Sequence, residues 1–361
     1  MSSQGAIQVA ILGATGRQGR RRADAVSRVP GLAVGLLADL PEAEKSLQEL
    51  ALRWECPFAT NWEQAVGQPQ IGAVIICTPN SRHAEMALAA LAHGKHVLVE
   101  KPLADTLASA QEVTDAARRA GLILKTGFNV PFRTQVREAL KCLRDGRIGE
   151  LLGIRGVISH SQFMGEGAGA KWFCQPGLAG HGAWLDLGIH LLELAQRTLN
   201  DVGDKACAVT AHLAGGRVIG APGPENRLEE ECVAVFRTRG GRLVSIHASW
   251  IEARPFAGAR MEWIGSQGRL EVDLGARTTR LCVREATGVR ESVSQFEYVD
   301  PDPSWTGELQ EFHRSILSSG SAWNPDDCSL EVHRLAFAAY ESARCGSTLD
   351  LSQWQGDASD S

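Results

Sequence analysis

The sequence predicts two domains of different fold class: an α/β domain with a doubly wound parallel sheet, then a domain with an open, mostly antiparallel sheet. Short β-branched runs alternate with helical segments through residue 127, which is typical of a doubly wound sheet. Beyond that point, runs of period two are separated by glycine-containing turns, as an antiparallel sheet requires. We therefore expect domains over residues 1–127 and 128–354, followed by a disordered tail over 355–361.

The composition limits the class of partner. The formal net charge of −5 comes without a long basic segment, which argues against a nucleic-acid or membrane-surface partner. No apolar stretch reaches the length of a membrane span, and the first residues lack the pattern of a secretion signal. Nine scattered cysteines form no Cys-x-x-Cys pair and no zinc-like grouping. We expect a cytoplasmic protein that binds a small molecule and no metal.

The first strand, 7–12, leads into a glycine turn and a segment of helical composition, 20–26. This order is typical of a dinucleotide-binding fold, because glycines let the backbone approach a pyrophosphate that then meets the helix N-terminus. The turn departs from G-x-G-x-x-G, with a threonine at the second glycine position and one extra residue before the last glycine. The residues expected to bind the cofactor here are Gly13, Thr15, Gly16, Arg17, Gln18 and Gly19.

The second strand, 32–38, ends at Asp39, where a dinucleotide fold places an acid on the adenine ribose hydroxyls. A carboxylate there repels a 2′-phosphate, so the sequence predicts NAD rather than NADP as the cofactor. The alternative is that Asp39 caps a helix that begins near Pro41.

The next strand, 73–77, ends at Thr78-Pro79-Asn80, and a helix over 83–93 returns the chain to the sheet. Thr78 and Asn80 offer polar groups to a cofactor, although Asn80 or Ser81 is also a possible helix cap.

A buried strand over 97–99 stops at Glu100-Lys101-Pro102. Proline cannot donate to a strand ladder, so Lys101 leaves the sheet at its carboxyl edge, where ligands of α/β proteins bind. A helix over 105–120 and a strand over 122–124 complete the domain.

The second domain begins with a helix that ends at Leu143 and closes with helices over 306–318 and 328–345. Between 163 and 183 lies a glycine-rich segment, and long loops of this kind are often functional. The expected strands cover residues 151–160, 206–213, 230–238, 243–251, 260–264 and 269–272.

A helix after this loop carries Asp186 and His190 four residues apart, on one face. A carboxylate beside an imidazole fixes the tautomer and raises the imidazole pKa, which suits a proton carrier. Oxidation of an alcohol by a nicotinamide needs such a carrier, and Lys101 and His190 are the candidates. The residues expected to contact the substrate are Lys101, Asn129, Trp172, His181, Asp186 and His190.

Taken in order, these motifs resemble the Gfo/Idh/MocA family, named for glucose-fructose oxidoreductase and inositol dehydrogenase. The resemblance rests on the glycine turn, Thr78-Pro79-Asn80 with His83, Glu100-Lys101-Pro102, the Asp186 and His190 spacing, and Glu308-Leu309-Gln310-Glu311-Phe312. It implies a Rossmann domain that binds NAD, with Pro79, His83, Glu100 and Lys101 at the cofactor, and a second domain used for substrate binding and oligomer contacts.

The resemblance also implies that Lys101, Asp186 and His190 form the catalytic set. The expected function is an NAD(H)-dependent oxidoreductase that interconverts a secondary alcohol and a ketone on a sugar, polyol or related cyclic hydroxyl compound, as a homodimer or homotetramer. Two alternatives stay open: an NAD-dependent glycoside hydrolase of the same family, and a non-catalytic nucleotide sensor. The family often has glycine where His181 stands and an Arg-Phe pair at Pro131-Phe132, so its substrate preferences are not carried over.

Overall fold

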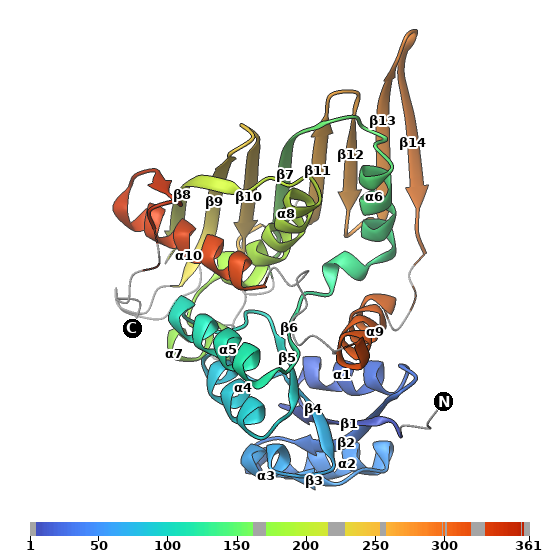
Figure 1. Cartoon of the computed structure of the whole chain (residues 1–361), viewed down its shortest axis with the longest axis vertical. Helices are drawn as coiled ribbons and strands as arrows, with labels where there is room; N and C mark the ends of the chain where they lie inside the picture. Colours follow the sequence, from blue (N-terminus) through green and yellow to red (C-terminus); the bar gives the residue numbers. More distant parts are fainter. Residues whose placement is uncertain are drawn as a thin grey trace. The chain divides into compact units, whose positions relative to one another are not determined.

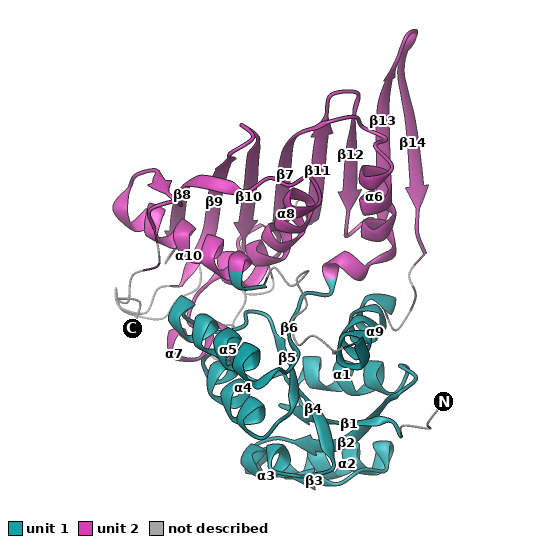
Figure 2. Cartoon of the chain, viewed as in Figure 1, with its two compact units in different colours: residues 1–129, 303–330 teal, residues 130–302, 331–361 magenta. Residues whose placement is uncertain are grey.

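Residues 1–129 and 303–330 form one unit, and residues 130–302 and 331–361 form a second (Figure 2). The computed structural model describes residues 5–161, 171–215, 228–252, 258–297, 299, 302–318, 329–354 and 356. The predicted loop residues 163–170, the start of the predicted helix at residue 328 and nearly all of the predicted tail lie outside these ranges.

The first unit contains a six-stranded sheet in the order β3-β2-β1-β4-β5-β6, and all of its strand pairs are parallel (Figure 1). The strand order reverses between β1 and β4, which confirms the predicted doubly wound sheet and places the ligand-binding edge at their carboxyl ends. The strands are β1 (Ile7–Leu12), β2 (Leu32–Ala38), β3 (Phe58–Ala59), β4 (Ile71–Ile76), β5 (His96–Glu100) and β6 (Leu124–Gly127).

Two apolar clusters cover this sheet, because alternate residues of each buried strand point to opposite faces. Ala10 and Leu12 of β1 join a cluster with α4 and α5, whereas Val9 and Ile11 join one with α1, α2 and α9. The helices are α1 (Arg17–Val26), α2 (Glu44–Trp54), α3 (Trp62–Val66), α4 (His83–Ala92), α5 (Leu107–Ala120) and α9 (Pro303–Ser318).

Helix α9 is the part of this unit that comes from late in the chain. Residues 306–318 are expected from the sequence in the second domain, but Leu309 and Phe312 are fully buried in the cluster that also contains α1 and α2. An amphipathic pattern shows that a helix buries one face, and it does not show which core receives that face.

The second unit contains a nine-stranded sheet in the order β14-β13-β12-β11-β7-β10-β9-β8-β15. Its pairs are antiparallel except for β7 and β10, which run parallel, so the prediction of a mostly antiparallel sheet is confirmed. The strands are β7 (Leu151–Ser159), β8 (Ala206–Gly215), β9 (Glu229–Thr238), β10 (Leu243–Ser249), β11 (Ala259–Gly265), β12 (Gly268–Asp273), β13 (Thr278–Glu285), β14 (Gly288–Gln295) and β15 (Leu349–Asp350).

Three helices of this unit, α6 (Thr134–Arg144), α8 (Ile189–Asp201) and α10 (Ser329–Cys345, in this unit from Glu331 on), lie on one face of the sheet (Figure 1). Side chains link them to it: the Trp263 indole of β11 donates to Thr198 of α8 (3.1 Å), and Ser342 of α10 accepts from the Ala211 N–H of β8 (3.1 Å). The other face carries the exposed side chains of the central strands.

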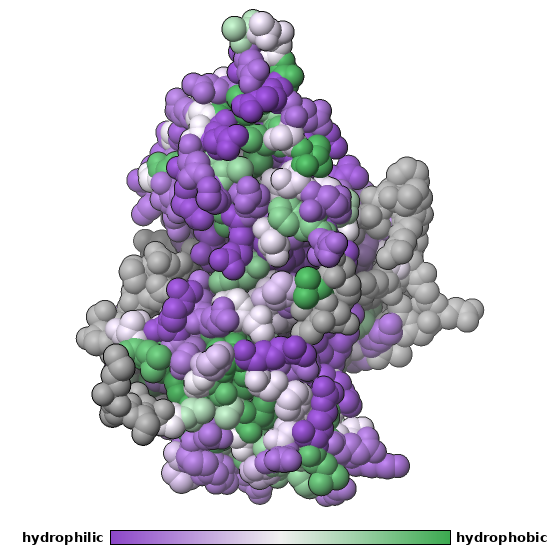
Figure 3. Space-filling view, turned by 90° about the vertical axis from the view of Figure 1, so that its right-hand side faces the viewer, coloured by the Kyte–Doolittle hydropathy of each residue, from purple (hydrophilic) through white to green (hydrophobic). Residues whose placement is uncertain are grey.

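The last two long strands, β13 and β14, are absent from the sequence prediction, which ends its strands at residue 272. Every residue of β14 is exposed, so the strand shows no apolar alternation that would mark a buried face. The surface on this side of the unit is mainly hydrophilic, with isolated apolar side chains (Figure 3). An edge strand of this polarity is protected against pairing with other chains.

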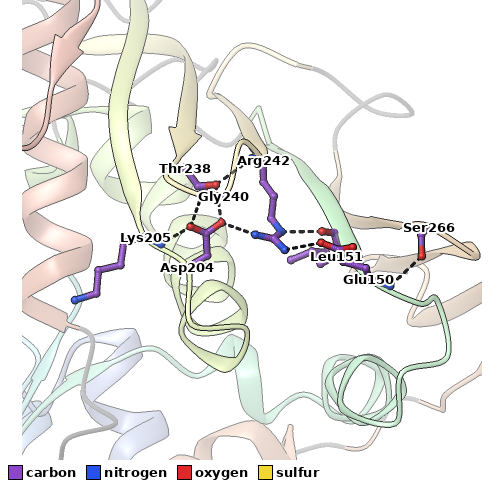
Figure 4. A network of polar contacts seen from close by, with 8 residues as sticks. All are labelled: Glu150, Leu151, Asp204, Lys205, Thr238, Gly240, Arg242 and Ser266. Carbon is purple, nitrogen blue, oxygen red and sulfur yellow. Dashed lines mark hydrogen bonds and ion pairs between the residues drawn. The ribbon is translucent and has the colours of Figure 1, made fainter.

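A network of polar contacts centred on Asp204 links the start of β10 to the start of its parallel neighbour β7 (Figure 4). The Asp204 carboxylate accepts bonds from the Thr238 hydroxyl (2.6 Å), the Gly240 N–H (3.0 Å) and the Arg242 guanidinium (2.7 Å). Arg242 also donates to the Leu151 carbonyl at the start of β7 (2.7 Å). Although burial alone raises it, these donors lower the pKa of Asp204 from 3.8 to about 2.

In the described part of the chain, no helix is both long and apolar enough to cross a membrane.

Candidate active site

The predicted cofactor turn lies between β1 and the first turn of α1. Gly13 has a φ of +75°, and a Cβ there would lie 2.6 Å from the Cys77 carbonyl oxygen. A Cβ on Gly19 would lie 2.2 Å from the Gly13 carbonyl oxygen, so both positions require glycine. The N-cap of α1, Gly16, places no side chain on the first N–H groups of the helix. The turn therefore fits a pyrophosphate, whose charge the helix N-terminus favours.

Asp39 follows β2 and points to this turn. Its Oδ2 accepts from the Thr15 backbone N–H (2.8 Å) and the Thr15 hydroxyl (2.7 Å), and its Oδ1 accepts from the Leu40 N–H (2.9 Å). The short helix η1 (Pro41–Ala43) has Leu40 as its N-cap and no side-chain cap, so the alternative role of Asp39 as a helix cap is not observed. The carboxylate fits the ribose end of a dinucleotide.

Thr78, Pro79 and Asn80 follow β4 at the same edge and are all half-buried. The Thr78 hydroxyl contacts the Met86 sulfur at 3.5 Å. Helix α4 has Arg82 as its N-cap without a side-chain bond, so neither Asn80 nor Ser81 caps that helix.

His83, a predicted cofactor residue, is completely buried. Its ring nitrogens lie 2.7 Å from the Pro102 carbonyl oxygen and 3.0 Å from that of Thr78. Burial lowers the pKa of His83, despite these two acceptors. The residue therefore links the loops that follow β4 and β5.

Glu100, also a predicted cofactor residue, is buried in an ion pair that no pattern in the sequence indicates. Its Oε1 accepts from Arg22 of α1 at 2.6 Å, and Arg22 also pairs with Glu308 of α9. Burial raises the pKa of Glu308 despite the opposing charge of Arg22. These buried charges fix the residue directly before Lys101, which is half-buried where β5 ends.

Asn129, a predicted substrate residue, is buried where the chain leaves the first unit, 6% exposed. Its side-chain amide donates to the Ser304 hydroxyl at 3.0 Å, so it ties the segment after β6 to the start of α9.

In the second unit, Asp186 lies in a π-helical turn, η6 (Trp184–Gly188), rather than in the regular helix that the sequence predicts. Such turns are frequent at functional sites. Its Oδ2 accepts from the Trp250 indole N–H at 3.0 Å and lies 3.9 Å from His160 Nε2. His190 is half-buried at the start of α8, one turn later.

The two neighbours of Asp186 are absent from the sequence prediction. His160 directly follows β7, and Trp250 directly follows β10. Only the parallel pairing of β7 with β10 brings these positions to one edge, and the two strands are far apart in sequence.

The predicted substrate residues of the glycine-rich loop lie against aromatic rings. His181 stacks on Tyr340 with ring centroids 4.4 Å apart and meets Phe337 edge-on at 5.2 Å. These three residues border a cavity of about 320 Å³. Trp172 is 38% exposed and meets Phe173 edge-on at 5.7 Å.

Metal ligands of the usual kind do not gather in the described ranges, where no group of three or more His, Cys, Asp or Glu side chains is placed to hold an ion.

A doubly wound parallel sheet, with a glycine turn after its first strand and an acid after its second, is typical of dinucleotide-dependent enzymes. The model of the GFO_IDH_MocA oxidoreductase family, with its NAD-binding Rossmann fold, matches residues 7–128, and the GFO/IDH/MocA C-terminal domain matches residues 136–271. The chain belongs to the Gfo/Idh/MocA family, which confirms the predicted family, and its first unit is an NAD-binding Rossmann domain.

Named relatives are similar over much of their length. The chain is 31% identical to a 1,5-anhydro-D-fructose reductase of Ensifer adhaerens over 261 residues, which are 72% of this chain and 74% of the relative. It is 27% identical to a scyllo-inositol 2-dehydrogenase (NAD(+)) of Bacillus subtilis over 359 residues, 96% of each chain. A solved levoglucosan dehydrogenase in complex with NADH and L-sorbose shares the fold, with a TM-score of 0.84 and 24% identity over 96% of this chain and 98% of that one.

Proposed function

We propose that the protein is an NAD(H)-dependent dehydrogenase or reductase that interconverts a secondary alcohol and a ketone on a sugar, polyol or related cyclic hydroxyl compound. The observation that carries the proposal is the family match over both units. The named relatives support the substrate class, because their names refer to an anhydro-sugar and to an inositol.

In the proposed reaction, the glycine turn and Asp39 would hold NAD(H), which would supply the hydride chemistry. The Lys101 ammonium orients the substrate hydroxyl and stabilises it as it loses its proton. His190 takes that proton, and Asp186 holds the imidazole in the receiving tautomer. The position of Lys101 directly after β5, at the carboxyl edge of the NAD-binding sheet, supports its role.

NAD is proposed as the preferred cofactor over NADP. The Asp39 carboxylate at the end of β2 repels a 2′-phosphate, and the Thr15 bonds hold it in place.

A substrate panel tests the proposal. Purified protein is mixed with NAD or NADP and with inositols, levoglucosan and other sugars and polyols, and with NADH and 1,5-anhydrofructose in the reverse direction. The expected result is a change in NADH absorbance with at least one compound, and faster with NAD than with NADP. Cleavage of a glycoside without net NADH formation would instead show the hydrolase. Tight NADH binding without turnover of any compound would show the sensor.

We also propose a cytoplasmic homodimer or homotetramer. The eight cysteines in the described ranges are all free thiols, which fits a reducing compartment. The open face of the second unit's sheet supports self-association, because Val157 and Val233 lie on it on either side of His247 and are 43% and 41% exposed.

A further inference from the structure

The orientation of Asp186 is set by two residues at one edge of the second unit's sheet. Ser159 of β7 pairs with Ser249 of β10 in parallel register, so the next residues, His160 and Trp250, leave the sheet together. The His160 N–H donates to the Ser249 carbonyl at 3.1 Å, and the Trp250 N–H donates to the Glu230 carbonyl at 2.8 Å. Both backbones are therefore fixed before their side chains reach Asp186.

The Trp250 indole is a rigid donor in this position. The side chain is fully buried, whereas the Asp186 side chain is 28% exposed. An indole N–H donates only and does not titrate, so the donor of this 3.0 Å bond is present at every working pH. One carboxylate oxygen is thereby engaged by the protein core while the group stays accessible to solvent.

The π-helical turn that carries Asp186 is held from the other side by Glu229. That carboxylate accepts from the Gly182 N–H (2.8 Å), the Trp184 N–H (3.0 Å) and the Tyr340 hydroxyl (2.7 Å). The turn can then neither slide along its axis nor unwind at its start without breaking these bonds. Asp186 is fixed through its backbone by Glu229 and through its side chain by Trp250.

We propose that Trp250 is a positioning residue of the active site: its indole N–H aims the Asp186 carboxylate so that Asp186 can orient His190. This inference rests on the proposed function. Among the described residues of this unit, the charged or titratable groups in the surroundings of Asp186 include His160 after β7, His190 of α8, Glu229 of β9 and Lys171, whose charge acts with that of Asp186 on the Cys174 thiol.

The activity test compares Trp250→Phe with a matched control, Trp263→Phe. Both variants lose a buried indole N–H bond, but Trp263 donates to Thr198 and not to Asp186. For Trp250→Phe we expect kcat to fall at least tenfold and the KM for NAD to stay within twofold, because the indole acts on Asp186 and not on the cofactor. Trp263→Phe should keep the wild-type kcat and KM. Equal losses in both variants would overturn the proposal.

A double variant separates positioning from a general packing defect. In an Asp186→Asn background, Trp250→Phe should reduce kcat less than twofold further, because the group that it positions is already changed. A full tenfold further loss would show that Trp250 acts independently of Asp186 and would contradict the proposal.

An NMR measurement of the Trp250 indole tests the contact without depending on turnover. In ¹⁵N-labelled protein, the indole signal that disappears in Trp250→Phe identifies Trp250 among the nine tryptophans. That signal should shift in Asp186→Asn, because the carboxylate oxygen that accepts the indole N–H is changed. If no substrate is turned over, the proposed function fails while this signal still reports the Trp250 to Asp186 contact. A signal unaffected by Asp186→Asn would overturn the inference itself.

Discussion

The hydroxyl and the backbone N–H of Thr15 both donate to the same oxygen of Asp39, at 2.7 and 2.8 Å. The threonine that departs from the usual glycine pattern thus fixes the acid that is expected to select the cofactor. Only Oδ1, which also accepts from the Leu40 N–H, has acceptor capacity left for a ribose hydroxyl.

Replacement of Asp39 should change the cofactor preference. For Asp39→Ala we expect kcat/KM with NAD to fall roughly tenfold, about 1.4 kcal/mol, and the ratio of NAD to NADP activity to fall further because the repulsion of a 2′-phosphate is lost. Thr15→Val keeps the backbone bond and should show a smaller change in the same ratio, and Thr15→Ser should be near wild type. An unchanged ratio in Asp39→Ala would remove Asp39 from cofactor selection.

Lys101→Met should reduce kcat by roughly 10²-fold or more, because the ammonium acts on the substrate hydroxyl. NADH binding should stay largely intact. Steady-state rates and NADH fluorescence titration measure the two effects. Lys141→Met, a change at an exposed lysine of α6, is the control and should keep activity. Turnover retained in Lys101→Met would exclude this residue from the mechanism.

If Lys101 and His190 serve one reaction, their losses are not additive. Lys101→Met/His190→Asn should be about as slow as the slower single variant. Fully multiplicative losses would show that the two residues act in separate steps.

The buried pair of Arg22 with Glu100 and Glu308 should be needed for the stability of the first unit. Arg22→Met leaves two buried carboxylates without their cation, and we expect a loss of about 3–5 kcal/mol in the free energy of unfolding. Arg53→Met is the matched control, since Arg53 also lies over a tryptophan ring and pairs with a carboxylate, but is exposed. It should cost less than about 1 kcal/mol. Denaturant titration compares the two, and equal losses would contradict the prediction.

The second unit should become less stable as the pH falls, because protonation of Asp204 removes its stabilising contribution. Its pKa is about 2 in the folded protein against an ordinary 3.8, so its contribution is fully present above pH 3.8 and is lost as the pH falls through 2. Asp204→Asn should therefore cost about 2 kcal/mol at neutral pH. The difference from wild type should shrink between pH 4 and the acid limit of the folded state. A difference that stays constant over that range would refute the assignment.

Charged side chains introduced on the open sheet face of the second unit should prevent self-association. The double variant Val157→Asp/Val233→Asp places two carboxylates on the row that runs through His247, and we expect the oligomer to dissociate into monomers in light scattering after gel filtration. Leu52→Asp, at an 80% exposed position of α2, is the control and should keep the wild-type mass. An unchanged mass in the double variant would place the interface elsewhere.

The sequence predicts the glycine turn and its order with β1 and α1 well, because the pattern is local. Gly13 and Gly19 are required by close approaches to Cys77 and to Gly13 itself. Lys101, Asp186 and His190 also stand in motifs of the sequence, and their common catalytic role stays a prediction. Arg22 is not, since it stands in a run of three arginines and only the fold shows which of them is buried with Glu308.

Trp250 and β14 could not be predicted for different reasons. The role of Trp250 depends on the parallel pairing of β7 with β10, a contact between strands that do not follow each other in the chain. Strand β14 buries no face, so its residues carry no periodicity to recognise.

The return of α9 to the first unit means that the nucleotide-binding module is not a continuous stretch of polypeptide. A fragment that stops at residue 129 would lack Leu309 and Phe312. It would expose the apolar residues of α1 and α2 that share their cluster, together with the guanidinium of Arg22. Any chimera that borrows this module for another substrate domain must therefore transplant two separate segments and graft its new partner between them.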